Sequence, residues 1–172
     1  MKIILSEKLP RILKNKKRLE SELNVKITNN GKDVSIDGSP EDEYLAEKVI
    51  DALNMGFPYS TAMLIKEENF ILEIMNIKDY TSRKDLERIR ARIIGKDGKT
   101  LKTLNNLTRC YFEINENLVG VLGAPEHIKY AQEALISLIK GTKQSNVYAY
   151  LEKHQVKPVE DLGLRDAKYK NL

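Results

Sequence analysis

The sequence contains an internal repeat, and this repeat limits the possible folds more than any other feature. Residues 34–41 (Val-Ser-Ile-Asp-Gly-Ser-Pro-Glu) match residues 119–126 (Val-Gly-Val-Leu-Gly-Ala-Pro-Glu), which is an offset of 85 residues. The same offset relates Leu19 to Leu104, Val25 to Cys110, Ala46 to Ala131, Leu53 to Leu138 and Gly56 to Gly141. A chain with such a repeat is expected to fold as two copies of one structural unit.

Both copies show the same order of apolar residues and chain breakers. Val34 and Ile36 alternate with polar neighbours, which predicts a strand with one buried face. A Gly then permits a turn, a Pro starts a helix, and Gly56 ends it in the first copy as Gly141 does in the second. With the upstream segments included, each copy is predicted to run strand, helix, helix, strand, strand, helix. The expected fold class is α+β, with the two repeats packed as one unit.

These patterns divide the chain into four parts. Residues 1–56 form the first repeat and residues 69–152 the second. Residues 57–68 join them and contain too many apolar side chains for a free linker. Residues 153–172 are charged and lack periodicity, so we expect a tail that becomes ordered on a partner.

Composition excludes several classes of protein. Cys110 is the only cysteine, so the chain has neither a disulfide framework nor a thiolate metal site. No apolar run is long enough to span a bilayer, and residues 1–9 lack the apolar core of a signal peptide. We therefore expect a cytoplasmic protein with no membrane partner, and no cofactor is predicted.

A run of basic residues lies in the second repeat. Between positions 78 and 109, ten Lys and Arg residues stand against four Asp and Glu residues, a net charge of +6, whereas the whole chain carries +4. The ten are Lys78, Arg83, Lys84, Arg88, Arg90, Arg92, Lys96, Lys99, Lys102 and Arg109. Charge runs are usually solvated helix surfaces, so the position of this run decides its meaning.

Within the run, two glycines bracket a corner between two predicted helices. The first helix spans residues 83–94, Gly95-Lys96-Asp97-Gly98 follows, and the second helix spans residues 99–107. Glycine lets a sugar-phosphate backbone approach closely, and the amides that open the second helix favour an anion. An ordinary helical corner is the alternative interpretation, but the element order and the surrounding basic residues favour phosphate binding.

These segments resemble a type I K-homology (KH) domain. The resemblance rests on residues 92–100 (Arg-Ile-Ile-Gly-Lys-Asp-Gly-Lys-Thr) and on the strand-turn-helix of residues 119–126. In that family the GxxG loop clamps about four nucleotides of a single strand. The resemblance implies a groove that includes Ile93, Ile94 and the strand 111–114, although each of these residues taken singly could be core. The RNA-binding residues predicted here are Arg92, Ile93, Ile94, Gly95, Lys96, Asp97, Gly98, Lys99 and Lys102.

The first repeat departs from this pattern. At the same offset, Pro10 and Leu13 stand where the second repeat has Gly95 and Gly98. Basic residues at positions 14 and 16–18 could contact phosphates loosely, but the paired glycines are missing. We therefore expect a degenerate KH repeat that supports the second repeat or contacts a protein partner.

About two thirds of the chain shows a closer resemblance. It is similar to the Pno (partner of Nob) family of small-subunit ribosome assembly factors, through residues 54–57, 62–65, 70–73, 105–109, 138–141 and 145–148 in addition to the GxxG segment. The resemblance implies binding of single-stranded rRNA near the 3′ end of the small-subunit precursor, beside the PIN-domain endonuclease Nob on the pre-small ribosomal subunit. Eukaryotic members carry an N-terminal extension, and this chain begins at the first KH repeat, so we expect the archaeal form.

Three alternative functions fit parts of the sequence. Gly98-Lys99-Thr100 matches the end of a P-loop, but Ile93 occupies the place of its first glycine and a helix, not a strand, is predicted before it. A KH subunit of another RNA machine, such as an exosome, usually has further domains. A pure protein-interaction scaffold is the third alternative, and nucleic-acid binding assays with and without the GxxG loop would separate it. His127 and His154 lie in no nucleophile or metal-ligand pattern, so we predict neither catalytic residues nor metal ligands.

Overall fold

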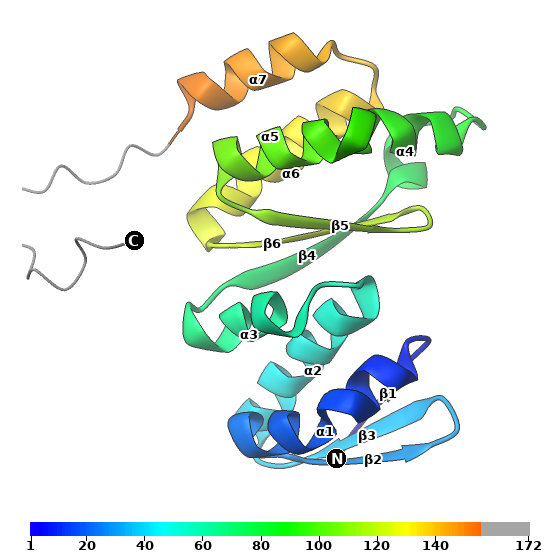
Figure 1. Cartoon of the computed structure of the whole chain (residues 1–172), viewed down its shortest axis with the longest axis vertical. Helices are drawn as coiled ribbons and strands as arrows, with labels where there is room; N and C mark the ends of the chain where they lie inside the picture. Colours follow the sequence, from blue (N-terminus) through cyan, green and yellow to red (C-terminus); the bar gives the residue numbers. More distant parts are fainter. Residues whose placement is uncertain (156–172) are drawn as a thin grey trace, which may run out of the picture.

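The computed structural model describes residues 1–155, and it contains two similar units stacked along the long axis of the molecule (Figure 1). Each unit has a three-stranded antiparallel sheet with its third strand in the middle, in the orders β1-β3-β2 and β4-β6-β5. The predicted α+β class with two repeats is therefore confirmed. Most of the predicted charged tail, residues 156–172, lies outside the described residues.

The first repeat contains β1 (Lys2–Leu5), α1 (Leu9–Leu23), β2 (Lys26–Asn30), β3 (Asp33–Asp37) and α2 (Pro40–Met55). One part of the prediction was wrong for this repeat, because α1 is a single continuous helix of 15 residues where two helices were expected. Pro10 lies in its first turn, where no backbone N–H is needed, and no glycine interrupts it. Ile12, Leu19 and Leu23 form its buried face.

The start and end of α2 follow the predicted pattern. Ser39 is its N-cap, with Oγ accepting a hydrogen bond from the Asp42 N–H at 3.2 Å, and Pro40 is its first residue. Gly56 ends it in the left-handed region, at φ 113°. The local signals read from the repeat thus fix both ends of this helix.

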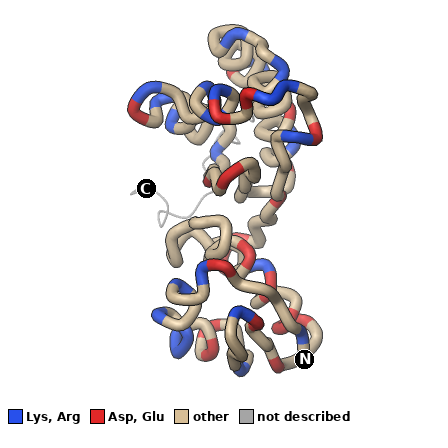
Figure 2. Tube along the Cα trace, turned by 90° about the vertical axis from the view of Figure 1, so that its right-hand side faces the viewer, with Lys and Arg blue, Asp and Glu red and all other residues tan. Residues whose placement is uncertain are grey.

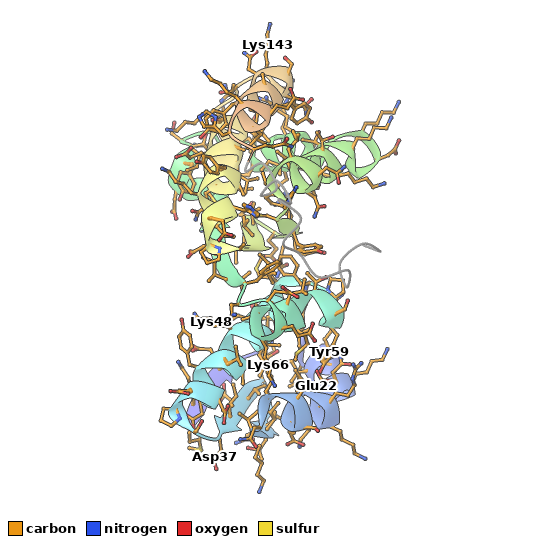
Figure 3. The ribbon with its side chains drawn as sticks, turned by 90° about the vertical axis from the view of Figure 1, so that its left-hand side faces the viewer. Glu22, Asp37, Lys48, Tyr59, Lys66 and Lys143 are labelled. Atoms are coloured by element: carbon orange, nitrogen blue, oxygen red, sulfur yellow. The ribbon has the colours of Figure 1, made fainter. Side chains whose placement is uncertain are left out.

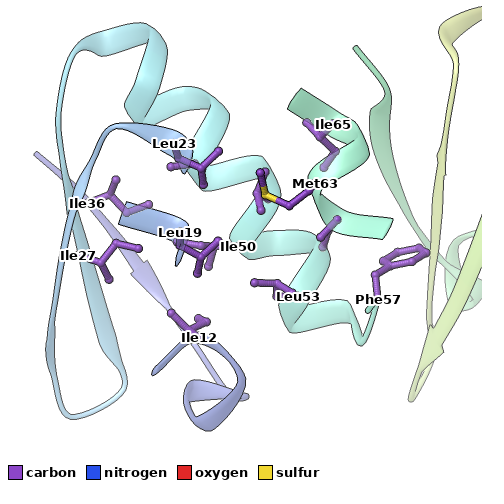
Figure 4. Packing of buried hydrophobic residues seen from close by; sticks show 14 of the residues in the cluster. Ile12, Leu19, Leu23, Ile27, Ile36, Ile50, Leu53, Phe57, Met63 and Ile65 are labelled. Atoms are coloured by element: carbon purple, nitrogen blue, oxygen red, sulfur yellow. The ribbon is translucent and has the colours of Figure 1, made fainter. Parts of the chain in front are cut away.

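The segment between the repeats is a helix packed on the first repeat. α3 (Tyr59–Glu67) buries Ala62, Met63 and Ile65 in the first core, beside Leu23 and Leu53 (Figure 4). Polar contacts hold α3 on α1. Lys66 Nζ donates a hydrogen bond to the Glu22 carbonyl (Figure 3). The Arg18 guanidinium lies 4.3 Å from the centre of the Tyr59 ring, which Figure 3 also labels.

The second repeat contains the expected helix pair and one further helix. Its elements are β4 (Ile71–Asn76), η1 (Ile77–Tyr80), α4 (Leu86–Ile94), η2 (Lys96–Gly98), α5 (Lys99–Thr108), β5 (Tyr111–Asn115), β6 (Leu118–Gly123), α6 (Pro125–Ile139) and α7 (Gln144–Lys153). α4 begins three residues after the predicted start at Arg83, whose N–H is instead bonded to Thr81 Oγ1 at 3.2 Å. Sequence patterns did not predict α7, which packs on α5 and α6.

The two repeats meet across the second sheet. α4, α5 and α6 cover one face of this sheet, and α2 and α3 of the first repeat approach the other (Figure 1). Val119 to Gly123 of β6 are therefore all buried, whereas β3 of the first repeat alternates buried and exposed positions. Phe57, only 1% exposed, lies against Gly120, where a Cβ atom would be 2.9 Å from the ring. Leu122 belongs to the first core, so side chains of both repeats share one packed interface.

Among the described residues, no helix has the length and apolarity that crossing a membrane requires.

We expect Phe57→Ala to lower the free energy of unfolding by about 3–5 kcal/mol, since it leaves a cavity between the repeats. Chemical denaturation followed by circular dichroism measures this, and Phe57→Leu, which keeps most of the volume, should lose much less. The wild-type protein should unfold in one transition, because both repeats share this interface. Two separate transitions, or an Ala variant as stable as the wild type, would contradict this account.

Candidate nucleic-acid interface

The GxxG loop adopts a conformation that depends on its glycines. Gly95 has φ 75°, and a Cβ atom there would lie 2.1 Å from Thr100 Oγ1 and 2.8 Å from the Thr100 backbone nitrogen. Asp97 and Gly98 also have positive φ, at 55° and 73°. A Cβ atom at Gly98 would meet nothing within 4 Å, so that side of the loop is open. Gly95 is needed for packing inside the protein, and Gly98 leaves the backbone accessible from outside.

The start of α5 offers donors and positive charge to an anion. Gly98 is its N-cap and has no side chain to cap the first amides. Unbonded amides and the helix dipole favour negative charge at this point. Lys96, Lys99 and Lys102 are all exposed around it. These residues lie together as the sequence predicted, and the arrangement suits a phosphate group.

A residue that sequence reasoning missed holds this loop in place. Gln144, the first residue of α7, donates from Nε2 to the Arg92 carbonyl at 3.2 Å and to Thr100 Oγ1 at 3.1 Å. The Arg92 guanidinium donates to the carbonyl of Thr142, just before α7. Both flanks of the loop are thus tied to one segment about 50 residues away, which no local pattern could reveal.

Two predicted site residues have a different position from the one expected. Ile93 is fully buried in the second core, so its side chain does not reach a groove, whereas Ile94 is 37% exposed. Successive helical residues point about 100° apart, so both could not face outwards. Arg92 is half-buried and bonded to Thr142, so it supports the α6–α7 connection rather than standing free beside the loop.

A hollow of about 410 Å³ lies between α5 and β5, beside the loop. Its lining includes Leu101, Lys102, Asn105 and Asn106 of α5 and Tyr111, Phe112 and Glu113 of β5. The predicted groove strand is therefore present, except that Ile114 is not part of the lining. Phe57, Pro58 and Thr61 from the joint close the other side, a contribution that the sequence did not suggest.

The polar groups of this hollow differ in their freedom to bind. Asn105 already donates to the Cys110 carbonyl at 2.8 Å, whereas Asn106 is exposed. Burial raises the pKa of the Glu113 carboxyl, and the charges of Arg11 and Lys8 from the first repeat partly oppose this shift. Tyr111 is 39% exposed and offers a ring face for base stacking.

Within residues 1–155, the cations of the second repeat form no ion pairs. Lys and Arg positions occur in both halves of the molecule (Figure 2), but the ion pairs of this part of the chain are Met1–Glu43, Lys2–Glu47 and Arg18–Glu22, all in the first repeat. No carboxylate of residues 1–155 therefore pairs with the positive charge between positions 78 and 109. A basic surface around an open groove is the electrostatic signature of a nucleic-acid-binding protein.

The other candidate chemistries find little support in this geometry. The residue before the loop is in a helix, so the strand that a P-loop requires is replaced by α4. Cys110 is fully buried, and burial raises its pKa to about 11, which makes it a packing residue and not a nucleophile. Among the described residues, no three His, Cys, Asp or Glu side chains are grouped to hold a metal ion. His127 and His154 line a small hollow next to Tyr130, and the His154 ring lies 4.4 Å from that of Tyr150.

Comparison with known proteins gives matches over nearly all of the described chain. Residues 71–156 match the model of the second KH domain of PNO1, described as a eukaryotic-type (type I) KH domain. Among curated proteins, KH domain-containing protein MJ0443 of Methanocaldococcus jannaschii is 29% identical over 149 residues, covering 83% of this chain and 66% of that protein. Pre-rRNA-processing protein PNO1 of Eremothecium gossypii is 36% identical over 105 residues, covering 59% of this chain and 39% of that protein.

Solved structures show the same architecture. The structure of Dim2p from Pyrococcus horikoshii OT3 superposes with a TM-score of 0.82 and 25% identity, covering 88% of this chain and 98% of that one. The complex of a/eIF2alpha, aDim2p and rRNA from the same organism contains a chain that matches with a TM-score of 0.81 and 27% identity, covering 90% of this chain and 93% of that one. The chain spans less than two thirds of the curated relatives named above.

We expect the double change Lys96→Asp and Lys99→Asp to weaken binding of single-stranded RNA roughly 100-fold, since both phosphate contacts become repulsive. Stability should change by no more than about 0.5 kcal/mol, because both side chains are exposed. Filter binding and thermal melting measure the two effects. The matched control is the double change Lys14→Asp and Lys17→Asp at exposed positions of α1. If both double variants lose the same RNA affinity, the GxxG loop is not a phosphate cradle.

Replacing the two glycines by Ala should have unequal costs. Gly98→Ala should cost about 1–2 kcal/mol of stability, because only its left-handed backbone is strained. Gly95→Ala should cost about 1–3 kcal/mol more, because its Cβ atom also collides with Thr100. Chemical denaturation of both variants gives the comparison. If both glycines cost the same, the inner and outer sides of the loop do not differ as described.

Proposed function

This chain belongs to the PNO1 family of ribosome assembly factors with type I KH domains, and we propose that it binds single-stranded small-subunit rRNA near its 3′ end and assists maturation of that end by the Nob endonuclease. The observation that carries the proposal is the GxxG loop, open at Gly98, whose exposed Lys96 and Lys99 are followed by Lys102 in the lining of a 410 Å³ groove.

The groove suits an unpaired strand. KH domains hold the phosphates of about four nucleotides on the GxxG loop while the bases lie in the adjoining groove. Here the groove has apolar walls from Leu101 and Phe112 for the base faces, and polar groups from Asn106 and Glu113 for their edges. A duplex keeps its bases stacked inside and could not fill such a groove.

The choice of rRNA is supported by the family and its neighbours. A relative bears the name pre-rRNA-processing protein, and a similar archaeal chain was solved in a complex with rRNA. The resemblance of the sequence to the Pno (partner of Nob) family is what suggests the 3′ end as the binding site and the PIN-domain endonuclease as the partner. We propose that the protein influences cleavage by positioning the substrate, as a bound and oriented strand reacts faster than a free one.

The first repeat has a supporting role in this proposal. Its α1 is continuous and provides no loop bracketed by glycines. The first repeat therefore lacks the phosphate cradle that the second repeat has. Its α2 instead packs on the second sheet, and the joint after it supplies Phe57, Pro58 and Thr61 to the groove. We propose that it stabilises the groove and offers its remaining surface to protein partners on the pre-small ribosomal subunit.

We expect the protein to bind a precursor fragment that spans the mature 3′ end of small-subunit rRNA at least about tenfold more tightly than a scrambled fragment, a difference of roughly 1.4 kcal/mol. It should also change the rate at which purified Nob endonuclease cleaves that fragment. Fluorescence anisotropy and a gel-based cleavage assay measure these effects, with the Lys96→Asp/Lys99→Asp variant as the control that should show neither.

The outcomes separate this proposal from its alternative. Binding that depends on the lysines but does not discriminate between the fragments would favour a KH subunit of another RNA-processing or translation machine. Absence of any lysine-dependent RNA binding would refute both, and would leave a protein-interaction scaffold.

A further inference from the structure

A second hollow, of about 330 Å³, lies between α4 and α6, and we refer to it as the arginine hollow. Arg83, Arg88 and Arg92 line it together with a single carboxylate, Asp85, over an apolar floor that includes Ile89 and Leu138. None of these residues lines the groove between α5 and β5. The arginine hollow is therefore a separate site, and the function proposed above does not use it.

Among the residues that the structure describes, no ion pair neutralises the three guanidinium groups. Within residues 1–155, no carboxylate lies within ion-pair distance of any of them. Arg83 and Arg88 are exposed. Of the three guanidinium groups, that of Arg92 donates a hydrogen bond within the described residues, to the Thr142 carbonyl. Arg88 and Arg92 are four residues apart on one helix, an arrangement in which like charges destabilise the helix. An anion bound between them would remove this repulsion.

The residue type also indicates a ligand. A solvated helix face is served equally well by lysine or arginine, but all three cations that line this hollow are arginines. Guanidinium groups bind phosphate through paired, parallel hydrogen bonds that a lysine cannot form. Lys140 and Lys143 lie in the connection that Arg92 contacts, and Lys143 projects outwards at the end of the molecule (Figure 3). Both lysines are exposed, so the connection that Arg92 contacts also carries positive charge.

The position of the hollow relates it to the GxxG loop. Arg92 precedes Gly95 by three residues, and Arg88 is seven residues before Gly95, or about 10 Å along α4. A strand whose phosphates cross the loop would therefore have the arginine hollow within reach of its next nucleotides. The groove lies along α5 and the hollow along α4, so the two sites flank one helical corner, as two contacts along a continuous strand would require.

We propose that the arginine hollow binds phosphate groups of RNA that continues beyond the nucleotides held in the groove. This inference rests on the proposed RNA-binding function and extends it to a second contact with a distinct role. The groove takes the bases of a short single strand, while the arginine hollow takes only backbone phosphates and so lengthens the bound segment without reading its sequence.

The test compares RNAs of two lengths. The short RNA has about four nucleotides and fills only the groove, and the long RNAs carry a further stretch of about eight nucleotides on the 5′ or the 3′ side. The variant Arg83→Ala with Arg88→Ala leaves Arg92 to hold Thr142. It should bind the short RNA as the wild type does, and at least one long RNA about tenfold more weakly. The slope of log affinity against log salt for that RNA should become shallower by about 0.7 for each phosphate that the variant no longer neutralises.

Two further variants sharpen the result. Lys26→Ala with Lys32→Ala removes the same charge from exposed positions of the first repeat and should affect neither RNA. Arg83→Lys with Arg88→Lys keeps the charge and should recover only part of the affinity for the long RNA. Melting curves verify that each variant is folded.

Each outcome decides the proposal. A loss confined to a long RNA supports it. Equal losses for short and long RNAs, or a loss for none, would overturn it and leave the proposed function intact. If the wild-type protein binds none of these RNAs, the proposed function fails and the second contact fails with it.

Discussion

The packing of Thr100 against the backbone of Gly95 determines the form of the second repeat. No side chain fits between them, so α4 and α5 can meet at this corner only if position 95 is glycine. Thr100 is buried, and its hydroxyl is bonded to Gln144, so the same contact also fixes the start of α7. The inner side of the loop is thus set by protein contacts while its outer side at Gly98 stays open. A cradle held in this way is organised before any ligand arrives, which lowers the entropic cost of binding.

The two repeats show how one template gave two different structures. Without the glycines, the helical region of the first repeat is one continuous helix, α1, and its sheet keeps the alternating pattern of a surface strand in β3. In the second repeat, β6 is buried along Val119–Gly123 because helices of both repeats cover its sheet. Apolar runs of this kind are typical of strands covered on both faces. The first repeat lacks a cradle but supplies the cover that the second sheet needs.

Much of the fold could be predicted from local patterns. The repeat, the alternation in β3 and the Pro and Gly at the ends of α2 each depend on neighbouring residues only, and the structure follows them. The continuous helix α1 was not predicted, because the offset of 85 residues led us to expect the helix break of the second repeat in the first repeat as well. The first repeat has no glycines at the matching positions to cause such a break. The burial of Ile93 could have been predicted from the sequence, because Ile89 and Ile93 are four residues apart on one apolar face of the helix.

Other features of the site depend on distant contacts that no window of sequence contains. Gln144 reaches Arg92 and Thr100 across 52 and 44 residues. Phe57 and Pro58 of the joint close the groove from the first repeat. Their positions follow from how the two repeats pack. The apolar joint predicted that the repeats would pack as one unit, but it did not predict which residues would meet.

The burial of Cys110 gives the molecule an internal reporter of its own opening. It is the only thiol in the chain, and Gly123 packs so closely on it that a Cβ atom there would lie 2.6 Å from the sulfur. A bulky alkylating reagent can reach this sulfur only when β5 and β6 separate from the helices above them. The rate of labelling under native conditions, divided by the rate for the unfolded chain, therefore gives the free energy of the opening that exposes this sulfur when reclosing is faster than labelling. The first repeat contains no thiol, so an opening confined to that repeat stays silent in the same measurement.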